Sequence, residues 1–311
     1  MMQIDTSGDA STAAGLYPIR TVSSLTGVNP ITLRAWERRY NLICPQRTAK
    51  GHRLYTQDDV ERIQRAVALL NQGISISQLK PLIDAAVPPA RLEAGDSDAW
   101  QHYRSRMLDA LQRFDETALD TAYNDALSLY PLELVTRHLV TPLLNHLGEH
   151  WQAHPAGIAE EHFFSVYLRN KIGARLHHLN AQQRGPQLLI SCLPGEHHEA
   201  GVLLFALAAV SHGYRTLTLG TNLPLHQIPP VLLQQHCDAV VLSGSTAPAS
   251  GLFDEQLPRL VKSIGIPVFV GGQISEPHCE AITAAGAIVL GQVFAPALDR
   301  IAEQLAANRQ R

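Results

Sequence analysis

The last third of the chain alternates short apolar runs with helical segments, five times in succession. The first run is residues 187–192, QLLISC, and four more follow at 216–219, 239–243, 267–271 and 287–290. The segments after the last four runs, at 226–235, 252–263, 276–285 and on to about 307, have a helical pattern. Strands that alternate with helices in this rhythm form a parallel sheet covered on both faces. The sequence therefore predicts a doubly wound α/β domain over residues 184–311.

Small, polar loops follow four of these predicted strands. Their sequences are GEHHEAG at 195–201, GTN at 220–222, SGST at 243–246 and GGQ at 271–273. Ligands bind such sheets beyond the carboxyl ends of the strands, so these loops are where a ligand would lie. None of them is a GxGxxG or a Walker loop, which argues against a nucleotide. Loops with such small side chains leave their backbone accessible, which favours close approach by a large flat or extended ligand.

Positive charge is concentrated near the N-terminus. Between residues 17 and 56 there are seven basic residues and one acidic residue, Glu37, which gives a local charge of +6. Because the whole chain carries −3, the remainder carries about −9. Such asymmetry is typical of a surface that meets a phosphate backbone. The basic residues are Arg20, Arg34, Arg38, Arg39, Arg47, Lys50 and Arg53.

The pattern within this basic segment predicts two helices joined by a turn. The first spans 19–26, with Val22 and Leu25 directed inward, and Gly27 supplies the turn. Asn29 followed by a proline is a typical start for the second, which runs to about residue 40. We expect Ile31, Ala35 and Trp36 to face a core, with Trp36 in the core rather than stacked on a base. Arg34 and Arg38 are four residues apart and share the other side.

Two short strands, at 45–47 and 49–55, follow around a glycine-containing turn. Thr56 then caps a third helix, with Asp59 three residues later, and a fourth begins at Ser77. Helix, turn, helix and basic hairpin together predict a winged helix-turn-helix, whose second helix enters the major groove of DNA.

The segment TLRAWERRYNLICPQRTAKGHRLYTQDDVERI resembles the DNA-binding domain of MerR-family transcription regulators, over residues 16–86. Asn41 stands where the family usually has glycine, and asparagine tolerates the same backbone region. The resemblance implies a double-stranded DNA operator as partner. It also implies that DNA is contacted by Arg34, Arg38, Arg39, Arg47, His52, Arg53 and Tyr55.

The middle of the chain is predicted to be helical. Residues 87–97, VPPARLEAGDS, have the composition of a linker. Beyond them, residues 98–183 show helical periodicity and few strand signals, which predicts a bundle of four or five helices.

The motif Glu196-x-His198-x-x-Gly201 resembles the DxHxxG signature of Rossmann-like cobalamin-binding domains, with glutamate in place of aspartate. The resemblance implies that His198 ligates cobalt from below and that the nucleotide tail of cobalamin is detached. Imidazole suits a transition metal, and a nearby carboxylate can orient its second nitrogen. A pocket for the detached base is implied at Ser243, Ser245, Gly271 and Gly272.

Trp151, nine further residues and then Glu161-His162 resemble the signature of the bundle that caps cobalamin in CarH- and LitR-type photoreceptors. The resemblance implies adenosylcobalamin as cofactor. Trp151 would pack over the adenosyl group and Glu161 would bond to it. His162 would become an upper cobalt ligand after photolysis.

Together these features predict a light-responsive repressor that forms a homo-oligomer, a dimer or a tetramer, and is not an enzyme. Two alternatives stay open: a MerR regulator that senses cobalamin without light, and a corrinoid methyl carrier or methyltransferase subunit. The pattern His146-x-x-Glu149-His150 also fits an inverted zinc-protease motif, but a third ligand is not evident. We interpret His138, His146, His150 and His154 as one polar helix face.

Composition agrees with a globular cytoplasmic protein. Hydrophobic residues make up 45% of the chain and charged residues 17%, which argues against disorder. The four cysteines are far apart, which excludes a disulfide framework or a cysteine-rich zinc site and favours a reducing compartment. Residues 1–15 predict a short disordered tail rather than a secretory signal. Apolar runs long enough to span a membrane are absent from the sequence.

Overall fold

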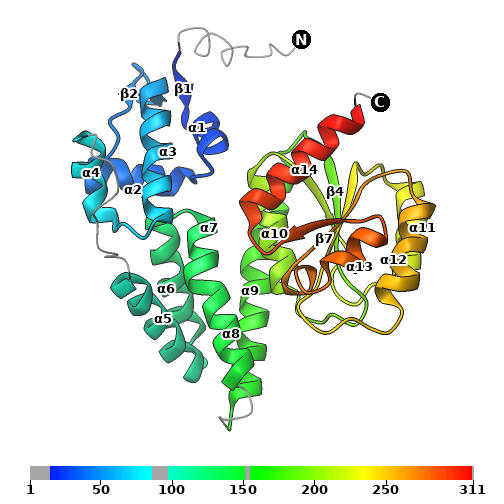
Figure 1. Ribbon diagram of the computed structural model, residues 1–311. Helices are drawn as coiled ribbons and strands as arrows, with labels where there is room; N and C mark the ends of the chain where they lie inside the picture. The colour runs from blue at the N-terminus through cyan, green and yellow to red at the C-terminus, as the bar shows by residue number, and fades with distance from the viewer. Residues whose placement is uncertain (1–14, 86–96, 151–154, 310–311) are drawn as a thin grey trace, which may run out of the picture. The chain divides into compact units, whose positions relative to one another are not determined.

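The computed structural model describes residues 15–85, 97–150 and 155–309 (Figure 1). The expected tail and linker lie almost wholly outside these ranges, as does Trp151. The chain divides into two compact units, residues 1–163 and 164–311. The division falls inside the long helix α9, Gly157–Asn180. In the described parts of the chain, no helix is both long enough and apolar enough to cross a membrane.

The first unit begins with four helices and a small antiparallel sheet. The strand order is β1-β3-β2, with Tyr17 opposite Tyr55 and Arg47 opposite Arg53. This is the predicted winged helix-turn-helix, with one addition: β1 is only two residues long, too short for a periodic signal. The elements are β1 Tyr17–Pro18, α1 Ile19–Thr26, α2 Pro30–Tyr40, β2 Gln46–Arg47, β3 Arg53–Tyr55, α3 Gln57–Asn71 and α4 Ile76–Asp84.

The predicted helix caps of this region are confirmed. The Asn29 side chain accepts hydrogen bonds of 2.9 Å from the backbone N–H groups of Ile31 and Thr32. Asn41 ends α2 in the left-handed region, with φ 47° and ψ 39°. Thr56 and Asp59 form a reciprocal capping box at the start of α3. These short-range bonds fix where α2 and α3 begin.

Two predicted core positions of this region are wrong. Leu25 is 50% exposed and Ile31 is 61% exposed. The buried face of α2 begins one residue later, with Thr32 and Leu33, and continues through Ala35 and Trp36. Ile31 is in the first turn of α2 and is exposed together with Arg34 and Arg38.

Four helical segments complete the first unit and lead into the second. They are α5 Ser97–Gln112, α6 Glu116–Leu129, a continuous run from Leu132 to His150, and α9. The run consists of α7 Leu132–Val135, a π-helical turn at Thr136–Val140 and α8 Thr141–His150. The helices of the predicted bundle are therefore present, with a π turn that hydrophobic periodicity does not signal.

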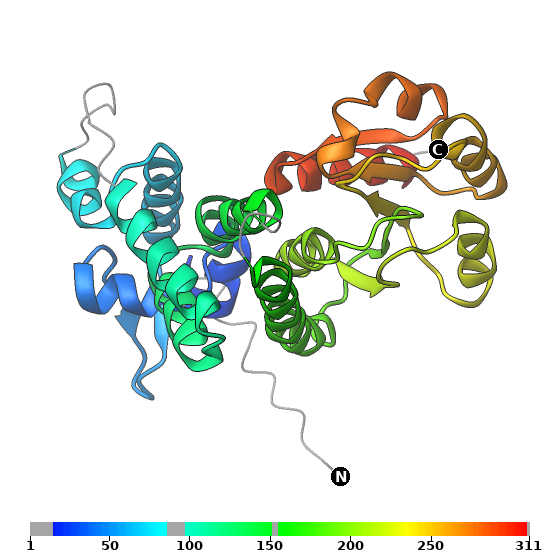
Figure 2. The same ribbon diagram turned by 90° about the horizontal axis from the view of Figure 1, so that it is seen from below.

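The second unit is a five-stranded parallel sheet in the order β5-β4-β6-β7-β8. Helices α11, α12 and α13 share one core with β4, β6 and β7, while α10 contacts α14; Figures 1 and 2 show helices on both faces. The strands are β4 Gln187–Cys192, β5 Arg215–Thr218, β6 Ala239–Ser243, β7 Val268–Gly271 and β8 Ile288–Gly291. The helices are α10 Ala200–Ser211, α11 Ile228–Gln234, α12 Leu257–Ser263, α13 Cys279–Ala284 and α14 Phe294–Arg309. Short helical turns lie at Leu225–Gln227, Leu252–Gln256 and Gln273–Ser275.

This strand order confirms the predicted doubly wound fold and locates its ligand edge. From β4 the chain first moves outward to β5 and then returns to add β6 on the other side. The strands β4 and β6 are in register up to Cys192 and Ser243 at their carboxyl ends. This is the switch point of the sheet, where ligands of such folds bind.

Candidate functional site

The recognition helix and the wing are joined by one acidic residue, Glu37. Its carboxylate accepts from Arg47 Nη2 at 3.0 Å and from Arg53 Nε at 2.5 Å. Burial alone would raise the pKa of Glu37, but the hydrogen bonds and charges of Arg53 and Arg47 hold it below its ordinary value. Glu37 therefore fixes both wing arginines against α2. Sequence reasoning missed this role, although Glu37 was visible as the one acidic residue of the basic segment.

The predicted DNA-contacting residues separate into exposed and buried positions. Tyr55 is fully buried, so it presents no surface to a duplex, and the expectation of a contact there is corrected. Tyr55 is the last residue of β3 and pairs with Tyr17 of β1. Burial raises the pKa of Tyr55 to about 12, which keeps its hydroxyl neutral. Arg53 is partly buried, and the exposed positions are Arg34, Arg38, Arg39, Arg47 and His52.

The buried side of the recognition helix is bonded to the bundle. Trp36 is fully buried, as expected, and its Nε1 donates to the carbonyl of Leu129 at 2.8 Å. The hydroxyl of Thr32 donates to the carbonyl of Leu127 at 2.9 Å. Leu127 and Leu129 are in the last turn of α6, whose carbonyls lack helical partners. The recognition helix thus supplies hydrogen bonds that the end of α6 needs.

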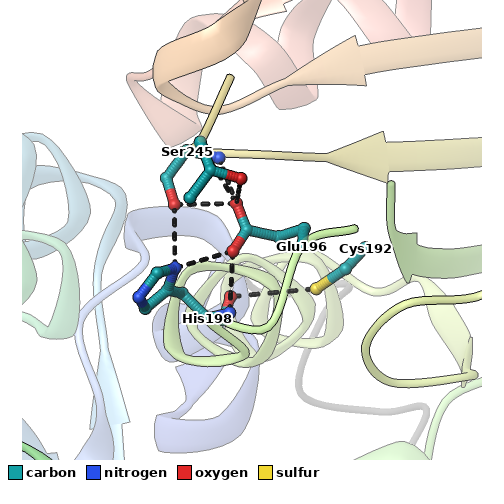
Figure 3. Close-up of polar contacts among 5 residues, drawn as sticks. Cys192, Glu196, His198 and Ser245 are labelled. Atoms are coloured by element: carbon teal, nitrogen blue, oxygen red, sulfur yellow. Dashed lines mark hydrogen bonds and ion pairs between the residues drawn. The ribbon is translucent and has the colours of Figure 1, made fainter. Parts of the chain in front are cut away.

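At the ligand edge of the sheet, Glu196 is the centre of a hydrogen-bond network (Figure 3). Its Oε1 accepts from the backbone N–H of His198 at 2.8 Å and lies 2.7 Å from His198 Nδ1. Its Oε2 accepts from the backbone N–H of Ser245 at 2.5 Å, from Ser245 Oγ at 2.8 Å and from the backbone N–H of Thr246 at 3.1 Å. The loops after β4 and β6 are thereby joined through one carboxylate.

This network keeps Glu196 ionised. The side chain is only 2% exposed, and burial would raise its pKa. Hydrogen bonds from the backbone and side chains of His198 and Ser245 outweigh that effect and lower the pKa to about 2. The His198 side chain, by contrast, is 58% exposed. A buried carboxylate therefore orients an exposed imidazole through Nδ1.

Cys192 lies beside this loop, and Figure 3 shows its sulfur directed toward the backbone of His198. Its sulfhydryl group donates to the carbonyl of His198 across 3.8 Å. Burial, with the charges of Glu196 and Glu199, raises the pKa of Cys192 to about 12, so the thiol stays protonated. The sequence signalled only a strand end at this position and did not reveal the contact.

Another contact that the sequence did not reveal is the ion pair of Arg169 and Glu199. Arg169 Nε, on α9, donates to Glu199 Oε2 at 2.6 Å. Glu199 is the residue that follows His198, so this pair links α9 to the histidine loop within the second unit. The two residues are thirty positions apart, and no local pattern predicts that they meet.

The loop glycines have different surroundings. Gly272 has φ +84°, and a Cβ there would lie 2.4 Å from the Gly244 carbonyl oxygen and 2.8 Å from Ser243 Oγ. Gly272 is therefore required by the packing of the β6 and β7 loops. A Cβ on Gly271 would lie 3.3 Å from the Gly291 carbonyl oxygen. At Gly201, by contrast, a Cβ would meet nothing within 4 Å.

The predicted cap residues lie near the start of α9, where His162 is exposed and Glu161 is partly buried. The rival zinc pattern ends at His150, whose side chain lies outside the described residues, so that alternative stays a prediction. His138 does not simply belong to a polar face, because its ring stacks on Trp100 at 5.3 Å.

Comparison with known families agrees with this arrangement. Residues 17–86 match the MerR HTH family regulatory protein model, and residues 103–176, from α5 to α9, match a B12 binding domain. The chain is 30% identical over 280 residues to the HTH-type transcriptional repressor CarH of Myxococcus xanthus, covering 86% of this chain and 93% of CarH. It is 28% identical to the repressor CarA of the same organism, covering 86% of this chain and 91% of CarA.

Among solved structures, the monomethylamine corrinoid protein of Methanosarcina barkeri has a similar fold. The TM-score is 0.52 at 17% identity, and the match covers 65% of this chain and 98% of that protein. The fold and the sequence matches together define a helix-turn-helix regulator joined to a B12-binding module. The chain belongs to the cobalamin-binding MerR-type transcription regulators, the family of CarH and CarA.

Proposed function

We propose that this regulator is a light-responsive repressor that uses adenosylcobalamin as its chromophore. The observation that carries cobalamin binding is the bonded pair of Glu196 and His198 at the switch point of the sheet. An imidazole whose Nδ1 is bonded to a carboxylate has a fixed ring orientation, with Nε2 as the coordinating nitrogen. We assign His198 Nε2 as the nitrogen that would hold the cobalt of cobalamin from the sheet side. The donor set fits, because imidazole suits a transition metal of this kind.

The same network supports a role for the surrounding loops. Ser245 and Thr246 hold Glu196, so Ser245 acts on His198 through that carboxylate. Ser243, Gly271 and Gly272 line the neighbouring strand ends, where we expect the detached base of cobalamin. Gly201 leaves room beside the histidine loop, which suits close approach of a bulky ring.

The cap residues distinguish adenosylcobalamin from other cobalamins. When bound, adenosylcobalamin supplies a cobalt–carbon bond that light breaks. An indole at Trp151 offers a broad apolar lid for the adenosyl group. The carboxylate of Glu161 would accept from adenosyl hydroxyl groups. We assign His162, which is exposed, as the imidazole that would hold cobalt on the side of the cap once the adenosyl group is lost.

DNA binding is the output of this arrangement. In darkness the ligand favours a homo-oligomer, a dimer or a tetramer, that holds its operator through several heads. Multiple heads raise affinity because each bound head increases the effective concentration of the next. Illumination would change the cofactor so that it no longer favours the oligomer. The oligomer would then dissociate and release DNA. The scheme requires only that the cofactor bind two arrangements with different affinity.

The test compares matched dark and illuminated samples of the protein with adenosylcobalamin by size-exclusion chromatography and gel shift. We expect a larger assembly and operator binding in darkness, and loss of both in green light. Hydroxocobalamin should support neither. Equal assembly size and equal DNA affinity in both samples would contradict light sensing and leave a light-independent cobalamin sensor.

The ligand assignment has its own variant pair. His198→Ala should lose most cobalamin affinity and change the absorption spectrum of the complex. His197→Ala is the matched control, because His197 is an exposed histidine one residue away that lies outside the Glu196 network. Unchanged affinity and spectrum in His198→Ala would contradict the lower-ligand assignment.

A further inference from the structure

An isoleucine is exposed at the start of the recognition helix. Ile31 is the second residue of α2 and is 61% exposed. Most large apolar residues in the described part of the winged helix-turn-helix domain are buried, but the Ile31 side chain is not and adds little to that core. An exposed isoleucine has a cost in water that is recovered only when another apolar group covers it. The position therefore indicates a contact that forms on binding.

Arginines surround Ile31 on the same helix face. Arg34 is three residues on and Arg38 seven, a spacing that places all three on one side of a helix. Both arginines are exposed, and so is Arg39 beside them. A partner that covers Ile31 must therefore also accept a strongly positive surface. Charge complementarity favours a polyanion over an apolar protein surface.

The backbone that carries Ile31 is held firmly from behind. Asn29 caps this turn through the N–H groups of Ile31 and Thr32. The Asn29 side-chain amide donates to Thr32 Oγ1 at 2.8 Å, and Thr32 Oγ1 donates onward to the Leu127 carbonyl at 2.9 Å. Ile31 is thus presented from a turn that is fixed before any partner arrives.

We propose that Ile31 reads the methyl group of a thymine in the major groove of the operator. In helix-turn-helix proteins the first residues of the recognition helix contact base edges. The thymine methyl is the apolar group that the major groove displays, and apolar side chains recognise it. The flanking arginines hold phosphates or guanines while Ile31 selects a T·A pair. This inference rests on DNA binding by the head.

The test removes the methyl group from DNA and the isoleucine from the protein separately. The full chain, in the cobalamin state that binds DNA, selects duplexes from a randomised pool. Each thymine of the selected duplex is then replaced in turn by deoxyuridine, which lacks only the methyl. At one thymine in each half-site we expect about a fourfold loss of affinity, the value of one buried methyl-sized group.

Ile31→Ala should bind the thymine and deoxyuridine duplexes equally, at about the affinity of the parent for deoxyuridine. Leu25→Ala is the matched control, because Leu25 is an exposed apolar residue of the same head on α1. That control should keep the full response to methyl removal. Size-exclusion chromatography of both variants should match the parent.

Three results would overturn the inference. The first is selective DNA binding that no deoxyuridine substitution weakens, and the second is Ile31→Ala with the parent's response to methyl removal. In both cases the DNA-binding function stands and only the role of Ile31 fails. The third is a smaller assembly in Ile31→Ala, which would make Ile31 a protein contact. A parent chain that enriches no duplex would instead overturn DNA binding itself.

Discussion

The indole Nε1 of Trp36, in the recognition helix, donates a 2.8 Å hydrogen bond to the carbonyl of Leu129 at the end of α6. The bond joins the DNA-reading element to the bundle that matches the B12 binding domain. Trp36 is fully buried, so the contact is shielded from water. A hydrogen bond in such a buried environment contributes more than one at the surface. A shift of α6 must therefore move the recognition helix or break this bond.

Thr32→Val tests that connection with little change of volume. The substitution removes the hydroxyl that donates to the Leu127 carbonyl. We expect the free energy of unfolding to fall by about 1–2 kcal/mol, because a buried carbonyl loses its partner. We also expect operator affinity to respond less to the cofactor state. Denaturant unfolding and gel shift with and without adenosylcobalamin measure the two effects.

Thr121→Val is the control for this change. Thr121 is exposed on α6, and its hydroxyl donates only to the carbonyl of Thr117 within that helix. It should change neither stability nor cofactor response by a measurable amount. If Thr32→Val behaves the same way, the bond from Thr32 to the Leu127 carbonyl does not couple the bundle to DNA binding.

The elements of the fold were predictable because their signals are local. The Asn29 and Thr56 caps, the left-handed Asn41 and the five apolar runs depend on residues within a few positions of one another. All five strands of the sheet match their predicted ranges to within one residue at each end. The loops that follow parallel strands lie together at the carboxyl edge of the sheet. This rule placed Glu196 and Ser245 at the same edge.

What could not be predicted depends on distant parts of the chain. Glu37 meets Arg53, Arg169 meets Glu199, and Cys192 meets the His198 carbonyl because the fold brings them together. Tyr55 is fully buried, and it pairs with Tyr17 of β1, a strand of two residues with no pattern of its own. Family resemblance named Tyr55 as a DNA contact, but resemblance transfers a residue type and not its exposure.

Arg53→Ala tests whether the wing meets phosphate. We expect weaker operator binding and a salt slope reduced by about one, because one charge contact to the backbone is lost. Release of Glu37 from Arg53 should add a repulsive charge near the duplex and weaken binding further. Band shifts across a salt series provide the measurement. Arg259→Ala, on α12 and highly exposed, is the control, and a slope equal to the parent's in Arg53→Ala would exclude the contact.

Glu196 should make the second unit sensitive to acid. Its pKa in the folded chain is about 2, below the ordinary value of 4.5. A carboxyl group whose pKa is lowered by folding stabilises the folded chain at pH values above its pKa in the unfolded chain. That contribution disappears as pH falls from about 4.5 toward 2. The shift corresponds to about 3 kcal/mol. Glu196→Gln should lower stability at pH 7 and flatten its decline in acid.

Urea unfolding followed by circular dichroism at several pH values measures this dependence. Glu303→Gln, on the exposed side of α14, serves as the control and should keep the parent's pH profile. Parallel pH profiles for Glu196→Gln and the parent would mean that the network around His198 does not hold the carboxylate ionised.

Two glycines at the ligand edge should respond in opposite ways to alanine. Gly272→Ala should destabilise the protein without cofactor by about 1–3 kcal/mol or more, because φ is +84° and the new Cβ would overlap the Gly244 carbonyl.

Gly201→Ala should leave stability equal or raise it slightly, because Gly201 is in the first turn of α10 and a Cβ meets nothing there. Cobalamin titration should nevertheless show weaker binding in Gly201→Ala, since the added methyl occupies space that we assign to the ligand. Thermal melting without cobalamin and absorption titration separate the two effects. Full cobalamin affinity in Gly201→Ala would show that the ring does not approach this turn.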